Sequence, residues 1–574
     1  MSSVLGIDLG TTNSVAAMVI DGRPVVIPNP FGKRVTPSVV SFTPEDEFLV
    51  GEPARNQAAI NSGRTVFSIK RRMGSVYKVW MEGKSYLPQE ISAVILRKLR
   101  RDAESFRKRK ITQAVITVPA YFNHAQRQAT KEAGTIAGLD VIRIINEPTA
   151  AALAYGLHEN PQPQTILVYD LGGGTFDVSL LEIGGGVFEV LAASGNNHLG
   201  GDDFDRILIE DVRTRFKKRT GVDLMTDPFS RNKLREEMEK AKISLSQLRS
   251  VSVSVPFISA TREGPVHLEE EFTQVQFEQM IETYVSSTIG PIHRVLNDSG
   301  RSLGEIDRVL LVGGSTRIPL VQRMIYEAVG IRPSISINPD EIVAMGAALQ
   351  GAILEGEIRG SVLIDVTPFT LGIETEGGGF ASIIPRNRPI PIERSRIFTA
   401  PPKEMGTIEI HVLQGELARA DQNVSLGRFH LQEIGCPKEE SKIRVTFSID
   451  TDGIVHVRAV NTSTGHRDEV TITDLKALSG NQLEQMTKSA DRCELEARQR
   501  EREIDRLVRT GQDLIRQARA LLDSLVKSEK EVMLESIGQL NDALSTCDRA
   551  ALKNCISDLE FLLEQMAEVT ERMP

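Results

Sequence analysis

One local pattern of aspartate, glycine and hydroxyl residues occurs twice in the chain. Each copy has an aspartate at the end of an apolar run, then a glycine-rich turn, then a second apolar run. The copies span residues 6–20 and 168–183 and contain Asp8 and Asp170. Glycines let backbone N–H groups approach phosphate oxygens, and aspartates are hard oxygen ligands for Mg²⁺. Carboxylates alone would repel phosphate, so the pattern implies a bridging cation. We expect two duplicated hairpins at a shared phosphate-binding cleft; two ordinary tight turns are the alternative.

A third glycine-rich turn, Gly313-Gly314-Ser315-Thr316-Arg317, follows another apolar run. Its two glycines could let the backbone meet a nucleotide base and ribose, and the planar side chain of Arg317 could stack on the base. Taken alone, the segment fits an ordinary structural turn equally well.

The elements that must position these turns change in type along the chain. Residues 1–357 alternate short apolar runs with helical stretches, which is typical of α/β proteins. Residues 358–366 form a short apolar link, unlike a flexible Gly/Ser linker. Residues 367–478 alternate apolar and polar side chains and predict an antiparallel β unit, with a hairpin at Asp452-Gly453. Residues 479–574 have leucines at helical spacing and predict a helical bundle.

The strands expected in the first part are Val4–Leu9, Ala114–Val118, Ile166–Tyr169 and Arg308–Val312. The helices expected between them include Ala125–Gly138 and Asn232–Gln247.

Composition narrows the classes of function. The 574 residues carry 68 Lys and Arg against 77 Asp and Glu, a net charge of −9, which argues against a general electrostatic grip on nucleic acid. No apolar run approaches the ~18 residues of a membrane span, and the start lacks a secretory signal pattern. The four cysteines follow no metal-binding spacing. We expect a cytoplasmic protein that binds neither nucleic acid nor membrane.

The three glycine-rich turns together resemble the phosphate and adenosine motifs of the superfamily of actin, sugar-kinase and heat-shock ATPases. Residues 117–123 and 146–157, which read TVPAYFN and NEPTAAALAYGL, narrow the resemblance to DnaK-type heat-shock chaperones, the seventy-kilodalton heat-shock protein family, in a bacterial-like short form. The resemblance implies a multidomain fold. Its parts would be an α/β actin-like (ribonuclease H-like) two-lobed ATPase domain at 1–357, an interdomain linker at 358–366, an antiparallel β-sandwich peptide-binding domain at 367–478 and a helical lid at 479–574.

The resemblance also implies an ATP-dependent molecular chaperone. Such a protein binds and releases extended apolar segments of unfolded proteins while it hydrolyses ATP. The cofactors implied are ATP/ADP and Mg²⁺, with K⁺ as a further candidate ion. The partners implied are unfolded polypeptides, a J-domain co-chaperone and a nucleotide exchange factor of the GrpE type.

A first set of residues is implied to act in hydrolysis. Lys70 matches the family's catalytic lysine, which would neutralise charge on the transferring phosphoryl group. Without the resemblance, Lys70 is a surface lysine and Glu147 a first-turn helix carboxylate. The expected catalytic residues are Lys70, Glu147, Asp170, Thr175, Asp177 and Asp8. Of these, Asp8 and Asp170 would hold Mg²⁺ through its waters.

A second set is implied to bind ATP. Spacings of three and four place Glu239, Lys242 and Ser246 on one helix face, where they match the family's adenosine pocket; an ordinary ion pair is the alternative. The expected ATP-binding residues are Gly10, Thr11, Thr12, Asn13, Gly172, Gly173, Gly174, Gly200, Gly201, Glu239, Lys242, Ser246, Gly313, Gly314, Ser315, Arg317 and Asp340.

Two further sets concern the peptide and its coupling to ATP. The residues implied to bind peptide are Ile373, Glu376, Phe398, Pro401, Ile408 and Ile410, for which plain β-sandwich core is the alternative. The residues implied in coupling are Pro119, Arg127, Arg143 and Asp365. Among these, Asp365 of the linker is expected to meet Arg143.

Four positions depart from the family pattern. His124 and Asn196 stand where the family usually has aspartate. Glu376 and Pro401 stand where the arch over the peptide backbone commonly has methionine and alanine. Glu376 and Pro401 leave the peptide preference open: Glu376 is either an exposed glutamate beside a looser arch, or it favours peptides with Lys or Arg close to the apolar anchor.

Other functions fit parts of the sequence. A nucleotide-binding exchange factor or holdase with little turnover would not need Lys70, Glu147 and Thr175. A small-molecule or sugar kinase, or a filament-forming actin-like protein, would need no β clamp or helical lid, which use over a third of the chain.

Overall fold

A computed structural model describes residues 3–570 of the chain, except residues 44–46, 82, 160–161, 263, 335–337, 401–406, 433–440, 463–466, 472–477, 479, 523–524, 526 and 547–548. Pro401, one of the expected peptide-binding residues, therefore lies outside the described residues. The chain forms two compact units, Met1–Thr487 and Lys488–Pro574.

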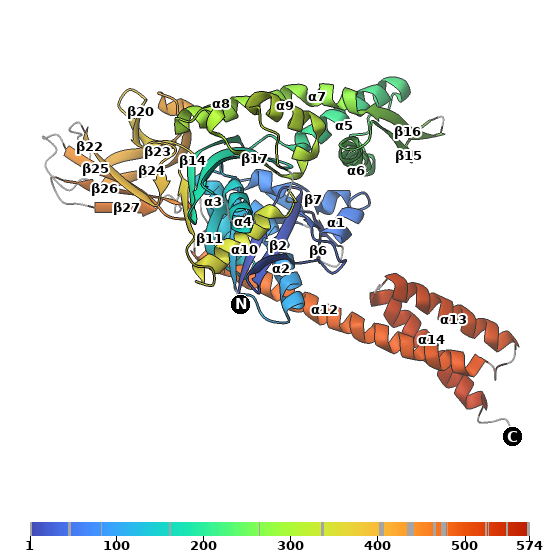
Figure 1. Cartoon of the computed structure of the whole chain (residues 1–574). Helices are drawn as coiled ribbons and strands as arrows, with labels where there is room; N and C mark the ends of the chain where they lie inside the picture. The colour runs from blue at the N-terminus through green and yellow to red at the C-terminus, as the bar shows by residue number, and fades with distance from the viewer. Residues whose placement is uncertain are drawn as a thin grey trace. The chain divides into compact units, whose positions relative to one another are not determined.

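Two β-sheets in the first unit share one plan, which accounts for the repeated sequence pattern (Figure 1). In each, an antiparallel hairpin holds the Asp-Gly turn, and a later strand runs parallel to the hairpin's first strand. The first sheet, in spatial order, contains β11 (Asp140–Asn146), β10 (Gln113–Val118), β1 (Val4–Asp8), β2 (Asn13–Ile20) and β3 (Arg23–Val26), with β4 (Thr36–Pro37) paired to β2. The second contains β17 (Arg308–Val312), β12 (Gln164–Leu171), β13 (Phe176–Gly184), β14 (Val187–Asn196), β18 (Val362–Val366) and β21 (Pro389–Ile390). All four strands predicted in this part are present.

Helices cover these sheets and begin where their sequences provide caps. The helix α3 (His124–Ile136) starts after Asn123, whose side chain accepts a hydrogen bond from the N–H of Gln126. The helix α2 (Pro88–Arg107) packs against α3, and α4 (Glu147–Glu159) packs against α10 (Ile342–Leu354). Since α10 is apolar along most of its length, it can also pack on β1 and β2.

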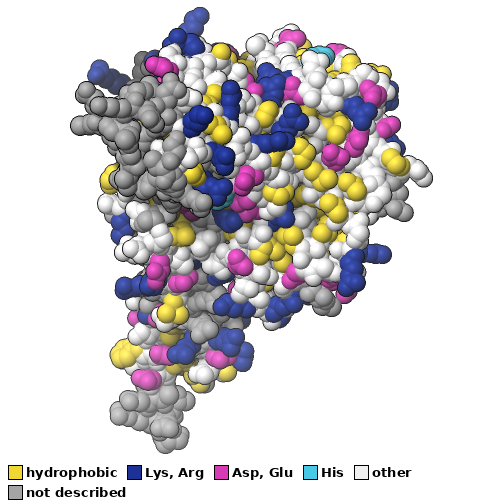
Figure 2. All heavy atoms as spheres, turned by 90° about the vertical axis from the view of Figure 1, so that its left-hand side faces the viewer, with side chains coloured by type: hydrophobic (Ala, Val, Ile, Leu, Met, Phe, Trp, Pro, Cys, Tyr) yellow, Lys and Arg dark blue, Asp and Glu magenta, His cyan; other side chains and the backbone are white. Residues whose placement is uncertain are grey.

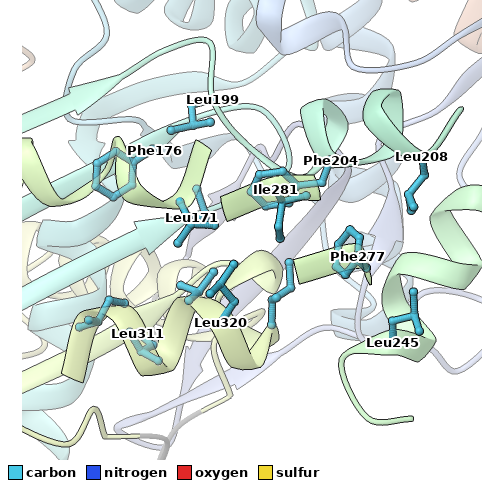
Figure 3. Close-up of a cluster of buried hydrophobic side chains, with 14 of the residues drawn as sticks. Leu171, Phe176, Leu199, Phe204, Leu208, Leu245, Phe277, Ile281, Leu311 and Leu320 are labelled. Carbon is cyan, nitrogen blue, oxygen red and sulfur yellow. The ribbon is translucent and has the colours of Figure 1, made fainter. Parts of the chain in front are cut away.

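The second sheet is buried under a large apolar core (Figure 3). Leu171, Phe176 and Leu311 from the sheet meet Phe204 and Phe277 from the helices in this core. The helices around it are α5 (Gly201–Thr220), α6 (Pro228–Leu245), α7 (Gln274–Ser286), α8 (Ile289–Ser299) and α9 (Pro319–Val329), and the hairpin β15 (Ser250–Thr261) and β16 (Gly264–Thr273) packs with α5, α6 and α7. The smaller elements of the first part are α1 (Glu52–Asn56), β5 (Val40–Phe42), β6 (Phe48–Val50), β7 (Thr65–Val66), β8 (Val79–Met81) and β9 (Lys84–Tyr86).

The apolar link between the two β regions is itself a strand. Residues of β18 pair in parallel with β14, so that Val362 lies opposite Val187 and Leu363 opposite Phe188. On its other side, β18 pairs with β21 through Asp365 and Ile390. The link therefore adds to the edge of the second sheet.

Two antiparallel sheets follow and face one apolar core that contains Phe447, Val457 and Leu431. One sheet contains β20 (Gly379–Ile384), β19 (Leu371–Thr375), β23 (Thr407–Gln414) and β24 (Val424–Gln432). The other contains β22 (Ile392–Ala400), β25 (Ser441–Ile449), β26 (Val455–Asn461) and β27 (Arg467–Thr471). The predicted turn at Asp452-Gly453 joins β25 to β26, with Gly453 at a φ of 76°.

The last part of the chain is helical, as its periodicity predicts. Its helices are α12 (Gly480–Leu521), α13 (Lys527–Thr546) and α14 (Arg549–Thr570). Leu514, Leu540 and Leu559 belong to its core. No helix in the part of the chain that the structure describes is long and apolar enough to span a bilayer. On the face drawn in Figure 2, basic and acidic side chains are interspersed.

Candidate functional site

A cavity of about 920 Å³ brings the three glycine-rich turns together. Its volume is in the range of pockets that hold small organic ligands. Most of the residues expected to bind or hydrolyse ATP line it: Asp8, Gly10, Thr11, Thr12, Asn13, Lys70, Glu147, Asp170, Gly172, Gly173, Thr175, Glu239, Lys242, Ser246, Gly313, Gly314, Ser315, Arg317 and Asp340. Gly174, Gly200, Gly201 and Asp177 lie next to this lining.

Contact between the two hairpin turns explains why some of these positions are glycine. A Cβ on Gly173 would lie 1.9 Å from the hydroxyl oxygen of Thr12, and a Cβ on Gly174 would lie 2.8 Å from that of Thr11. A Cβ on Gly200 would lie 2.6 Å from the backbone of Gly173. The duplicated turns therefore touch each other as well as the cavity. A larger side chain at Gly173 would push them apart.

A buried ion pair stands among the carboxylates of the cavity. The Nζ atom of Lys70 lies 2.5 Å from Oε1 of Glu147, and their side chains are 5% and 9% exposed. The ammonium group also lies 5.7 Å from the centre of the Phe122 ring. Lys70 is thus held inside the cavity and is not the surface residue that its basic neighbours suggest.

The carboxylates Asp8, Asp170, Asp177 and Glu147 lie close to one another around Lys70. Burial, followed by the charge of Glu147, raises the pKa of Asp8 to about 7 and that of Asp177 to about 7. The same two causes, in the same order, raise the pKa of Asp170 well above its usual value. Lys70 opposes all three shifts. A divalent cation would balance the negative charge of these carboxylates.

The arrangement fits a Mg²⁺ ion that keeps other ligands besides the protein. Among the described residues, no group of three or more His, Cys, Asp or Glu is placed to hold a metal directly. Mg²⁺ commonly binds through one or two carboxylates, waters and phosphate oxygens. Asp8 and Asp170 can provide that kind of site.

At the other end of the cavity, Arg317 is held by two neighbours. Its guanidinium lies 2.6 Å from a carboxylate oxygen of Asp340 and donates to Oδ1 of Asn338 at 3.0 Å. These partners leave the flat guanidinium at the cavity wall beside Gly313 and Gly314.

Glu239 and Lys242 of α6 line the cavity together with Ser246, the residue that directly follows this helix. Lys242 donates to Asp205 at 2.7 Å, and Arg55 of α1 donates to Glu239 at 2.8 Å. The sequence analysis missed Asp205 and Arg55, because no local pattern links them to α6. The Arg55–Glu239 pair joins two segments 184 residues apart beside the cavity wall that Glu239 lines.

The linker carboxylate has partners other than the one expected. Asp365 accepts hydrogen bonds from the side-chain amide of Asn146 at 2.8 Å and from the hydroxyl of Thr149 at 3.3 Å. Arg143 instead lies 3.9 Å from Asp452. The predicted Asp365–Arg143 contact is therefore wrong, since Arg143 is engaged by the β25–β26 turn.

Asp452 of that turn is one of the residues at the contact with the α/β part, together with Arg386 and Asn387, which donate to Asp298 of α8. The Asp452 carboxylate lies 2.6 Å from Nζ of Lys131 and accepts from the N–H of Ile144 at 3.0 Å. Its carbonyl accepts from Arg127 at 3.4 Å. Sequence reasoning identified Asp452 only as a turn former.

Arg127 and Pro119, also expected in coupling, lie beside this contact. The buried guanidinium of Arg127 donates to Oδ1 of Asn146 at 2.7 Å and to the carbonyl of Ala120 at 3.1 Å. Pro119 directly follows β10, and its carbonyl accepts from the N–H of Phe122 at 3.1 Å. Because the Phe122 ring also faces Lys70, this loop joins the cavity to the sandwich contact.

The expected peptide-binding residues belong to the sandwich. Ile373 and Ile410 are buried in its core, and Phe398 and Ile408 are partly buried against that core. Glu376 is exposed in the turn between β19 and β20.

Comparison with known protein families gives one finding. A family model described as "Hsp70 protein" matches residues 4–573 of the chain.

Proposed function

The chain belongs to the Hsp70 family, and on that premise we propose how its residues divide the work of the protein. It is an ATP-dependent molecular chaperone and an ATPase, with an actin-like ATPase part, a β-sandwich and a helical lid. It uses ATP and ADP with Mg²⁺, and acts on unfolded polypeptides with J-domain and nucleotide exchange co-chaperones.

We divide the chain into an ATPase domain at 1–357, a linker at 358–366, a peptide-binding domain at 367–478 and a lid at 479–574. Two observations support these proposed boundaries. The described strands up to β17 belong to the α/β part, and the linker strand β18 separates them from the sandwich. The helical core lies after residue 480.

In the proposed site, the backbone of the two hairpin turns holds the phosphates of ATP. Lys70 offsets negative charge that develops on the transferring phosphoryl group, because its ammonium is buried at the cavity and cannot be screened by bulk water. Glu147 orients Lys70 and accepts a hydrogen bond from the attacking water. Thr175, which lines the same cavity, holds that water or a phosphate oxygen with its hydroxyl. Bound Mg²⁺, held by Asp8 and Asp170 through water, would neutralise phosphate charge.

We propose that the adenosine lies between α6 and the Gly313–Arg317 turn. Glu239, Lys242 and Ser246 would bond the ribose and base edge, and Arg317 would stack on the base plane. The observation that carries the whole assignment is the 920 Å³ cavity that unites both phosphate turns with these two walls.

We further propose that the sandwich holds an extended peptide by main-chain hydrogen bonds, with one apolar pocket. Ile373, Phe398, Ile408 and Ile410 would line the pocket, with Glu376 and Pro401 beside the peptide backbone. Coupling to ATP would run from Lys70 through Phe122 to Arg127, and from there to Asp452.

Two finer assignments complete the proposal. The resemblance to the bacterial-like short form of the family leads us to propose an exchange factor of the GrpE type, whose addition should speed ADP release. The scarcity of cysteine favours the cytoplasm, where thiols stay reduced.

The test is single-turnover hydrolysis with and without an apolar peptide, in the parent, Lys70→Ala and Lys78→Ala. Lys78 is an exposed lysine eight positions later and serves as the matched control. We expect Lys70→Ala to bind Mg²⁺-ATP but to hydrolyse it 10²- to 10³-fold more slowly. Hydrolysis at the parent rate in Lys70→Ala would remove its proposed role. A parent with bound ATP and no turnover would instead favour the exchange factor or holdase alternative.

A further inference from the structure

A histidine of the α/β part bonds directly to the backbone of the sandwich. His124 is the first residue of α3 and is 5% exposed. Its Nδ1 atom accepts a hydrogen bond at 3.1 Å from the N–H of Val455, the first residue of β26. A backbone N–H can only donate, so Nδ1 carries no proton in this arrangement. The ring is therefore neutral, with its proton on Nε2.

The His124 ring also lines a small cavity at the same contact. His124, Gln414 and Phe369 are among the residues that line this cavity of about 20 Å³. Neither Nε2 of His124 nor Oε1 of Gln414 has a hydrogen-bond partner among the described residues. The cavity is large enough for one water molecule, which can accept from Nε2–H and donate to Oε1. A water held there would give the neutral ring a hydrogen bond at Nε2 as well as at Nδ1.

A protonated His124 ring would lose its hydrogen bond at Nδ1. Its new N–H on Nδ1 would point at the N–H of Val455, so a hydrogen bond would become a repulsion between two donors. His124 also stands in the first turn of α3, where the helix dipole disfavours positive charge. Burial, then His456 of β26, then Arg127 of α3 lower the pKa of His124 to about 4.

The acidic groups around the contact are already engaged elsewhere. Asp452 of the β25–β26 turn is bonded to Lys131. Asp450 of the same turn accepts from the N–H groups of Asp452 and Ile454 and lies 3.7 Å from His456. Asp365 of β18 is bonded to Asn146 and Thr149, as described above. None of these three carboxylates has a hydrogen bond or ion pair to His124 in the described structure, so none would stabilise a charged ring.

We propose that His124 makes the docking of the β-sandwich on the ATPase sensitive to pH, because protonation of its ring breaks the docked contact. The docked form holds His124 without a proton on Nδ1, so low pH favours the undocked form. With an ordinary undocked pKa of ~6.5 and the docked value of about 4, the docking constant falls roughly tenfold between pH 7.5 and 5.5. The consequence for peptide rests on the coupling proposed above, in which docking drives peptide release. Low pH would then slow the release of bound peptide.

The test uses the full chain and hydrogen exchange of the amides of β18 and Val455. Results are expressed as protection factors, so that the pH dependence of intrinsic exchange cancels. Mg²⁺-ATP is present throughout, at pH 7.5, 6.5 and 5.5. We expect protection in the parent to fall about tenfold over this range.

Two variants and one control test whether the pH dependence of protection comes from His124. His124→Asn keeps an acceptor near the position of Nδ1 but does not titrate, and His124→Asp titrates below the range; both should stay within about twofold. His267→Asn is the control, because His267 also accepts a backbone N–H at Nδ1, from Phe257, but in an exposed hairpin. It should follow the parent.

A parent whose protection does not change with pH would overturn the proposal, and so would His124 variants that fall as the parent does. Peptide release on ATP addition at pH 7.5 is measured in parallel. If ATP does not speed release while protection still depends on His124, the coupling fails and the pH-sensitive contact stands.

Discussion

Removal of the Asp452 carboxylate should release the sandwich from the ATPase without unfolding either part. Asp452→Ala deletes a 2.6 Å ion pair to Lys131 and a hydrogen bond from the N–H of Ile144. The N–H of Ile144 belongs to a buried residue, and leaving it without a partner costs about 1–3 kcal/mol. The Lys131 side chain is 35% exposed, so its screened pair adds only ~1 kcal/mol. Docking should weaken by about 2–4 kcal/mol, or roughly 30- to 1,000-fold.

The assay is the protection of the β18 amides in the presence of Mg²⁺-ATP, with peptide-stimulated ATP hydrolysis measured on the same samples. Asp452→Ala should lose protection and stimulation, and keep its basal ATP binding and its melting temperature. Asp452→Asn retains an acceptor for the N–H of Ile144. Its β18 protection should therefore lie between that of the parent and that of Asp452→Ala. Asp421→Ala removes an exposed ion pair to Arg419 on the same sandwich and should match the parent. Parent-like β18 protection in Asp452→Ala would refute the reasoning, since the contacts of the Asp452 carboxylate would then not contribute to docking.

Four shorter predictions concern the nucleotide, the linker, the peptide and pH. Calorimetry should show that ADP binds far better than GDP and that Arg317→Ala costs about 1–3 kcal/mol; equal affinities would remove the adenosine assignment. Asp365→Ala should leave basal hydrolysis and peptide binding in place but abolish peptide stimulation, and full stimulation would contradict its role. Glu376→Lys should reverse the preference of a peptide panel for basic flanking residues, with a change of about tenfold that high salt flattens; an unchanged ranking makes Glu376 an ordinary surface residue. The raised pKa values of Asp8 and Asp177, each about 7, stabilise the nucleotide-free protein at low pH, and this stabilisation is lost as pH rises through 7. The rise in melting temperature on Mg²⁺-ATP addition should therefore be larger at pH 8 than at pH 6.

The predictions from sequence succeeded where the chemistry is local. Asp8 and Asp170 were assigned to one cleft because each ends a buried strand before a glycine-rich turn, and strand, turn and phosphate-binding chemistry all lie within about 15 residues. The cavity brings both together, as the duplicated sheets require. The change along the chain from α/β structure to antiparallel β structure to helices was also predicted correctly, because each type of element has its own period of apolar residues.

Contacts between distant segments could not be predicted in this way. Arg55 and Glu239 are 184 residues apart, and nothing near either residue indicates the other. Asp452 was predicted as a turn residue, which it is, but its second role depends on which surface the turn meets. The expected Asp365–Arg143 pair failed for a related reason. Arg143 and Asn146 lie on the same strand, and only the register of the docked linker decides which one Asp365 reaches.

The position of β18 has a consequence for the solubility of the protein itself. While docked, this strand covers the edge of the second sheet at β14, where Val187 and Phe188 lie. When the linker leaves, β14 becomes an open edge strand with unpaired backbone groups, and the partly buried side chain of Leu363 joins the already exposed Val362 in solvent. Open edges of this kind pair readily with other chains and seed aggregation. A protein that keeps other chains from aggregating thus exposes a similar hazard of its own in each undocked phase, and the short length of β18 limits that hazard to a few residues.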